Sequence, residues 1–256
     1  MFLGYSRNET NLIKIIETEG WTVKNYKNKI KSDKLFLKYD CIISFGYREI
    51  IPYEILNKIK KPIINLHISF LPYNKGANPN VWSFLEDTPS GVSIHEINNN
   101  IDGGPIIYKK FINFKNLNIS FNDSYIVLKK EIEKLFIENL NNILNYKYKK
   151  EKQINKGTIH YKSDLALLKE KKIFKSYKEP IIKVKKRYVE YLNKLQSEKL
   201  AIINQIENTR SKNNINWMDL LRNSYLNSPK ETMKILKNIN TDDLKISNLF
   251  KKLTKY

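Results

Sequence analysis

The sequence predicts an α/β protein: a mostly parallel sheet with flanking helices, followed by a helical C-terminal region. Two observations carry this prediction. Short apolar runs alternate with amphipathic helical patterns in the first half of the chain, and only helical patterns follow Pro180. The chain has 256 residues, of which 41% are hydrophobic, enough for a core. We therefore expect one α/β domain over residues 1–178 and a helical appendage over residues 179–256.

The N-terminal quarter is predicted to run strand, helix, strand, strand. The strands are expected at Met1–Gly4, Trp21–Val23 and Cys41–Phe45, and the helix around Leu12–Ile16, ended by Gly20. No G-x-G-x-x-G motif follows the first strand, which argues against a dinucleotide site.

A turn, Ser44–Pro52, follows the third predicted strand. Ligands in open sheets of this kind bind outside the carboxyl ends of the strands, so this turn is a candidate binding segment; an ordinary strand-to-helix loop is the alternative. Pro52 suits the start of a helix, which we expect to run through Ile59.

Polar side chains end the next predicted strand, where Ile63 and Ile64 are followed by Asn65-Leu66-His67. Residues two apart on a strand share a face, so Asn65 and His67 should emerge together. With Asp102, which opens a later apolar run, they form a set suited to acyl transfer to an amine. The amide donates to a carbonyl oxygen that gains charge, and the imidazole and carboxylate manage the proton. The alternative is a strand end capped by polar residues.

The loop 73–78 should lead into a helix with Asn78 as its N-cap and Pro79 as its first residue. On that helix Trp82, Phe84 and Leu85 are expected in the core.

Two paired strands are predicted next, at Gly91–Ile97 and Pro105–Ile112, with Asn98–Asp102 as the connecting turn. His95 is expected to have a structural role.

Helical spacing then predicts a long amphipathic helix over residues 122–144. The segment Gly157–Leu165 is either a strand followed by a helix capped by Ser163, or a border of a binding site. Later helical stretches are expected at Lys183–Glu207 and Trp217–Leu226, and further helices should start at Ser228-Pro229 and at Thr241-Asp242-Asp243.

The formal net charge of +20 invites a nucleic-acid partner, but its distribution argues against one. Residues 1–110 hold 15 basic and 11 acidic residues, a net +4, whereas residues 111–256 hold 31 and 15, a net +16. Arginine, which is preferred for reading bases, is scarce. The single cysteine, Cys41, lies in an apolar run and should be a buried thiol. No signal peptide or membrane span is apparent, so a soluble cytoplasmic protein is expected.

Three motifs occur in order within residues 65–107: N-L-H-x-S-x-L-P-x-x-x-G-A-x-P, G-V-S-I-H-E-I and I-D-G-G-P-I-I. Together they resemble the formyltransferases that use 10-formyltetrahydrofolate, which act on glycinamide ribonucleotide, methionyl-tRNA or amino sugars attached to nucleotides. The chain departs from the family pattern at Ile68, where proline is usual, and at Phe70, where leucine is usual. Both changes leave the three polar positions untouched.

The resemblance implies a Rossmann-like formyltransferase fold for residues 1–178 and a role for each group of site residues. Asn65, His67 and Asp102 would be catalytic. Two turns would hold the folate, Arg48, Glu49, Ile50 and Ile51 in the first and Asn98, Asn99, Asn100 and Ile101 in the second. Substrate contacts would come from Tyr73, Lys75, Asn78, His160 and Tyr161. The co-substrate would be 10-formyltetrahydrofolate, and no metal is implied.

Among family activities, the sequence favours transfer of the formyl group to the primary amine of a nucleotide-linked amino-deoxy sugar in surface-glycan biosynthesis. Gly157–Leu165 resembles a G-T-x-H-x-x-x-D-L segment of such enzymes, and the C-terminal region does not resemble the barrel of the methionyl-tRNA enzymes. A methionyl-tRNA formyltransferase, a formyltetrahydrofolate hydrolase and a catalytically idle binding module remain alternatives. The helical region is expected to serve docking or self-association as a homodimer.

Overall fold

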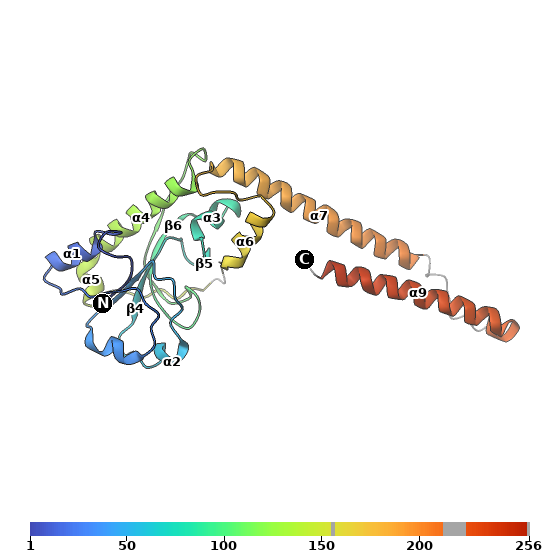
Figure 1. Ribbon diagram of the computed structural model, residues 1–256, viewed down its shortest axis with the longest axis horizontal. Helices are drawn as coiled ribbons and strands as arrows, with labels where there is room; N and C mark the ends of the chain where they lie inside the picture. Colours follow the sequence, from blue (N-terminus) through green and yellow to red (C-terminus); the bar gives the residue numbers. More distant parts are fainter. Residues whose placement is uncertain (155–156, 212–223, 255–256) are drawn as a thin grey trace. The chain divides into compact units, whose positions relative to one another are not determined.

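A computed structural model describes residues 1–154, 157–211 and 224–254 of the chain (Figure 1). The chain divides into two compact units, Met1–Arg187 and Tyr188–Tyr256. The domain boundary expected at residue 178 stays a prediction.

The first unit is built on a six-stranded mixed sheet in the order β2-β1-β3-β4-β6-β7. The strands are β1 (Phe2–Gly4), β2 (Asn25–Tyr26), β3 (Ile42–Phe45), β4 (Ile63–His67), β6 (Gly91–Glu96) and β7 (Ile106–Phe111). The first four are parallel to one another, and β4–β6 and β6–β7 are antiparallel pairs. The mostly parallel sheet predicted from the sequence is therefore confirmed.

Different helices pack on the two faces of this sheet (Figure 1). Helices α1 (Leu12–Thr18), α4 (Phe121–Glu138) and α5 (Leu140–Leu144) pack on one face, against alternate residues such as Ile64 and Leu66 of β4. The 3-10 helix η1 (Asp33–Lys38) and helix α2 (Tyr53–Leu56) cover part of the other face, where Ile63 lies. Since side chains alternate along a strand, Asn65 and His67 share the face of Ile63.

The second strand was predicted wrongly, since β2 is Asn25–Tyr26 and not Trp21–Val23. The chain leaves α1 at Gly20, whose φ is +86°. Trp21 and Val23 then pack against the apolar cluster beneath α1, so their side chains act as anchors before the strand begins.

Two predicted helices also differ in extent. Helix α2 ends at Leu56, and tighter bonds from Lys58 N–H to Ile55 O and from Ile59 N–H to Leu56 O continue the chain as turns. The helix predicted over residues 122–144 is split into α4 and α5 at Asn139.

A second, two-stranded parallel sheet was not predicted. It joins β5 (Lys75–Gly76) to β8 (Ile159–His160), which lie 84 residues apart in the sequence. Helix α6 (Lys162–Glu170) follows β8. Its predicted cap, Ser163, lies inside the helix, and the Asp164 carboxylate instead accepts the Tyr161 N–H at 2.7 Å.

Helix α3 (Pro79–Leu85) begins after Asn78, as predicted, but Asn78 does not cap it through its side chain. The residue has a φ of 55°, and its Oδ1 accepts the Tyr177 hydroxyl at 2.7 Å. Trp82, Phe84 and Leu85 are buried, which confirms their predicted place in the core.

The last two described helices are α7 (Ile181–Ser211) and α9 (Pro229–Leu253). The helix predicted to start at Thr241 is wrong, because Thr241 lies inside α9 and bonds the Lys237 carbonyl through its hydroxyl. Residues 217–223 of the predicted Trp217–Leu226 stretch lie outside the described residues. In the described parts of the chain, no helix combines the length and apolar character that a membrane crossing needs.

Candidate active site

The sheet places two of the predicted catalytic residues on one strand. Asn65 and His67 project from β4 on the face that η1 and α2 leave partly open, and β6 brings His95 opposite Asn65 and Ser93 opposite His67. This end of the face is polar, whereas Ile63, two residues earlier on the same strand, lies in the core.

Asp102 reaches this cluster from the turn between β6 and β7. Its Oδ1 lies 3.4 Å from Asn65 Nδ2, and its Oδ2 lies 3.7 Å from His67 Nδ1. The Gly76 N–H of β5 donates to Oδ2 at 2.8 Å. Asn65 and His67 therefore both lie next to the carboxylate of Asp102, so the three side chains that the sequence singled out lie together.

Burial and charge set the protonation of this group. Desolvation lowers the pKa of His67 below its ordinary 6.5, and the nearby Asp102 carboxylate offsets this only in part. Burial alone would raise the pKa of Asp102, but His67, His95 and the Gly76 N–H outweigh it and hold that pKa well below its usual range. A neutral imidazole beside an ionised carboxylate follows near neutral pH.

His95, for which the sequence indicated a structural role, touches two members of the set. Its Nδ1–H donates to the Glu96 carbonyl at 2.8 Å, and its Nε2 lies 3.0 Å from Asn65 Nδ2. Nε2 also lies 3.5 Å from Asp102 Oδ1. Strand register, which the sequence pattern does not reveal, creates this contact.

Asn74 is a further residue at the site that sequence reasoning missed. Its side chain is fully buried, and its backbone φ is 54°. Its backbone carbonyl oxygen lies 3.4 Å from His67 Nε2. Thr158 accepts the Asn74 N–H at 2.8 Å and donates to its Oδ1 at 3.2 Å. The partners are 84 residues apart, and no local pattern announces them.

The first of the two turns predicted to hold a folate has free backbone polar groups. Arg48, Glu49 and Ile50 are exposed, and their backbone groups make no hydrogen bond to another described residue. Ile51, at the end of the first turn, and Ile97, just before the second, pack in the same apolar cluster. A flat heterocycle with polar edges and apolar faces suits such a surface, on which the Ile50 side chain is 79% exposed.

The second turn contains Asn98, Asn99, Asn100 and Ile101, all exposed. The Asn98 side chain accepts the Asn100 N–H at 2.9 Å, and the Ile101 side chain is 42% exposed.

The predicted substrate contacts are more dispersed. Lys75 lies beside the cluster, because the N–H of the next residue, Gly76, donates to Asp102. Burial lowers the pKa of the Lys75 ammonium, and Asp102 opposes this. Tyr73 is half-buried and its carbonyl accepts the Ser69 hydroxyl. The His160 ring stacks on Trp82, with centroids 4.0 Å apart.

His160 also bonds the Glu86 carboxylate at 3.1 Å, whereas the next side chain, Tyr161, is 53% exposed. Asn78 is engaged by Tyr177. Whether these residues contact a substrate stays a prediction.

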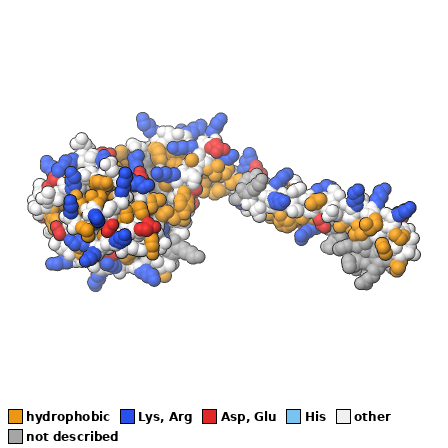
Figure 2. All heavy atoms as spheres, turned by 60° about the horizontal axis from the view of Figure 1, so that its bottom comes forward, with side chains coloured by type: hydrophobic (Ala, Val, Ile, Leu, Met, Phe, Trp, Pro, Cys, Tyr) orange, Lys and Arg blue, Asp and Glu red, His pale blue; other side chains and the backbone are white. Residues whose placement is uncertain are grey.

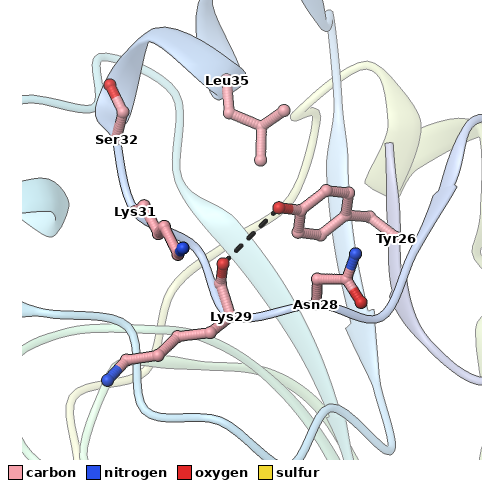
Figure 3. Close-up of a pocket in the computed structure, with 6 residues that line it drawn as sticks. All are labelled: Tyr26, Asn28, Lys29, Lys31, Ser32 and Leu35. Atoms are coloured by element: carbon pink, nitrogen blue, oxygen red, sulfur yellow. Dashed lines mark hydrogen bonds between the residues drawn. The ribbon is translucent and has the colours of Figure 1, made fainter.

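A pocket of about 440 Å³ lies elsewhere, after the carboxyl end of β2 (Figure 3). It is lined by Tyr26, Asn28, Lys29, Lys31, Ser32 and Leu35. The Tyr26 hydroxyl points toward the Lys29 carbonyl across it, at 3.5 Å. None of the three predicted catalytic side chains lines this pocket.

Comparison with known proteins places this geometry in context. The model of a family described as formyl transferase matches residues 3–139. A dTDP-4-amino-4,6-dideoxyglucose formyltransferase from Mycobacterium bovis is 28% identical over 132 residues, 52% of this chain and 55% of that protein. A methionyl-tRNA formyltransferase from Buchnera aphidicola is 32% identical over 166 residues, 61% of this chain and 50% of that protein. The chain thus spans about half the length of these curated relatives.

Among solved structures, the formyltransferase PseJ from Anoxybacillus kamchatkensis is 37% identical, with a TM-score of 0.65. The match covers 72% of this chain and 95% of PseJ, which was solved in complex with UDP-4,6-dideoxy-4-formamido-L-AltNAc and tetrahydrofolate. A 4-N formyltransferase from Francisella tularensis is 27% identical, with a TM-score of 0.51, over 64% of this chain and 65% of that one.

Proposed function

Since the chain belongs to the formyl transferase family, we propose that it transfers a formyl group from 10-formyltetrahydrofolate to the primary amine of a nucleotide-linked amino sugar. The proposal rests on one observation: Asn65 and His67 both lie next to the Asp102 carboxylate. An amide donor, a neutral base and an ionised carboxylate grouped in this way would suit a single reacting carbonyl, which supports the proposal.

In the proposed reaction each residue has a distinct task. When bound, 10-formyltetrahydrofolate supplies the activated formyl group. Asn65 donates an N–H to the formyl oxygen as that oxygen gains charge, for which its long, 3.4 Å bond to Asp102 is the one to give way. His67 takes the proton lost by the attacking amine, and Asp102 stabilises the charge that the ring then gains. As the new amide bond forms, the bond between the formyl carbon and N10 of the folate would break, and the proton held by His67 would pass to N10, so that tetrahydrofolate leaves.

For the acceptor, we favour a UDP-linked 4-amino-4,6-dideoxy sugar. The support is the similarity to PseJ, at 37% identity over 95% of that chain, together with the sugar product in its structure. Lys75, which precedes the Gly76 whose N–H bonds Asp102, would meet an anionic part of such a substrate.

Methionyl-tRNA is the second candidate acceptor, because a methionyl-tRNA enzyme is 32% identical to the chain. Basic side chains are dispersed among apolar and acidic ones on the face that Figure 2 shows, and they form no continuous stripe there. A tRNA enzyme would bind tRNA with a steep dependence on salt.

The direct test incubates the full-length protein with 10-formyltetrahydrofolate and a panel of amines. The panel holds the 4-amino precursor of the PseJ product, other UDP- and dTDP-linked amino sugars, and methionyl-tRNA. A sugar that gains the mass of one formyl group supports the proposal. Formate released without an amine indicates a hydrolase, and folate binding without transfer indicates an idle binding module. Either result contradicts the proposal.

We further propose that the reaction serves surface-glycan synthesis in the cytoplasm and that the second unit mediates self-association. Support for self-association comes from exposed apolar side chains on α7 and α9, among them Leu200, Ile203, Met233, Leu244 and Phe250.

A further inference from the structure

One side chain clamps the turn that carries Asp102 and has no part in the proposed chemistry. Gln153 Nε2 donates to the Asp102 carbonyl at 2.8 Å and to the Gly104 carbonyl at 2.7 Å. A side-chain amide has two N–H groups, so this turn uses both. Because only the nitrogen can donate, the two carbonyls also fix the orientation of the amide.

We propose that Gln153 is a positioning residue that holds the Asp102 carboxylate in place for formyl transfer, an inference that rests on the function proposed above.

The turn needs such a clamp because its backbone is unusual. Asp102 has a φ of 44°, in the left-handed region, which is uncommon for any residue but glycine, although Asp tolerates it better than most. The turn is also pressed against the end of β6, since a Cβ on Gly104 would lie 1.7 Å from the Glu96 carbonyl oxygen. Strained backbone persists only where its surroundings hold it.

Gln153 is itself held on a fixed segment. Glu151 and Ile106, the first residue of β7, exchange two backbone hydrogen bonds of 2.8 Å. Ion pairs reinforce the same segment, from Lys150 to Glu96 at 2.8 Å and from Lys109 to Glu151 at 3.0 Å. The clamp therefore acts from a segment already bonded to both strands that flank the turn.

The oxygen of the Gln153 amide indicates that the nitrogen is the atom on which the role of this side chain depends. Gln153 Oε1 is buried and has no hydrogen-bond partner among the described residues. A buried acceptor without a partner costs stability, and a methionine would fill the same space without that cost. The two N–H groups that bond the Asp102 and Gly104 carbonyls are what an apolar side chain cannot supply.

The clamp connects directly to the carboxylate. Asp102 Oδ2 accepts the Gly76 N–H, and Oδ1 faces Asn65. If the carbonyls of the turn are released, the backbone relaxes from its positive φ and the carboxylate leaves these partners. The arrangement of side chains needed for formyl transfer is then lost. The exposed turn at residues 48–50, which is predicted to hold the folate, is unaffected.

The test compares three full-length variants in formyl transfer: Gln153→Met, Gln153→Glu and, as a matched control, Lys152→Ala, whose side chain is exposed beside the clamp. For Gln153→Met, kcat should fall about 10- to 100-fold, as expected for a misplacement of about 1 Å, while KM for both substrates changes less than about twofold. Lys152→Ala should match the wild type.

Gln153→Glu gives a readout that a merely structural role would not move. Near neutral pH its carboxylate faces two carbonyls without a donor, so kcat should fall at least as far as in Gln153→Met. At lower pH the protonated carboxyl supplies one O–H, and its kcat relative to Gln153→Met at the same pH should rise.

Hydrogen exchange at the Gly76 amide tests the clamp without any activity, because that N–H is bonded to Asp102. Exchange should be faster in both Gln153 variants and unchanged in Lys152→Ala. An unchanged Gly76 exchange rate, or kcat values within about twofold of wild type, would overturn the inference. An inactive wild type would instead reject formyl transfer, and the exchange rates would still decide whether Gln153 holds the turn.

Discussion

At the residue scale, Asn65 is the side chain on which the proposed chemistry most depends. Its amide is the group placed to donate to the formyl oxygen, so Asn65→Ala should lower turnover about 10²- to 10³-fold. The fold should be retained, because Asn65 is only half-buried. Single-turnover formyl transfer with circular dichroism checks both points. Asn122→Ala, at an exposed position on α4, is the control. Near-wild-type turnover by folded Asn65→Ala would contradict the role.

His67 should make stability depend on pH. Because burial lowers its pKa in the folded state, the unfolded chain binds this proton at a higher pH than the folded chain does. The free energy of unfolding should therefore fall as the pH drops below about 6.5, by at most about 1.4 kcal/mol per pH unit from this group. Asp102, whose pKa is lowered, adds its loss only below about 3.8.

Urea unfolding of wild type and His67→Gln between about pH 7 and pH 5 measures this effect. The other histidines are present in both proteins, so the difference in slope belongs to position 67. The variant should lose less stability on acidification. Equal slopes would mean that His67 has the same pKa in the folded and unfolded chains.

At the scale of elements, the two-stranded β5–β8 sheet depends on the contact between Thr158 and Asn74. Thr158→Val should leave the buried Asn74 Oδ1 and N–H without this partner and cost about 1–3 kcal/mol in unfolding free energy. Chemical denaturation followed by tryptophan fluorescence measures it. Thr18→Val, at the exposed end of α1, should change stability by less than about 0.5 kcal/mol. A loss no larger in Thr158→Val than in this control would be the contrary outcome.

The elements that the sequence predicts correctly are those with a local signal. β4 has an apolar start and polar end within five residues, and α4 has regular spacing and a capping box between Ser120 and Asp123. The β5–β8 pairing has no such signal, because each strand is two residues long and its partner is remote. Trp21–Val23 was mistaken for a strand because anchoring side chains and strand residues have the same composition.

The same distinction applies within the site. Asn65, His67 and Asp102 were found because they lie in motifs. Gln153 acts through two backbone carbonyls, whose positions depend on the folded turn, so its residue type alone gives no hint of its role.

At the scale of the whole molecule, the two units should have separable roles. Ile181 and Val184 are fully buried in the first unit, so a chain ended after Lys194 keeps the start of α7 that the sheet domain needs. It should retain formyl transfer within about threefold and be monomeric if the second unit mediates self-association. Light scattering after size-exclusion chromatography gives the mass of each chain. A truncated chain with the same assembly as the full-length protein would reject that role.

The pairing of Gly76 with His160 has a consequence for synthesis on the ribosome. The six sheet strands are complete by Phe111, yet Ala77 N–H bonds the His160 carbonyl, and the neighbouring Gly76 N–H is the one that grips Asp102. A nascent chain that has emerged only as far as α5 would thus hold every member of the triad and Gly76 itself, but not β8, the strand that pairs with β5. The chain would become able to transfer a formyl group only late in translation, well after the sheet has formed.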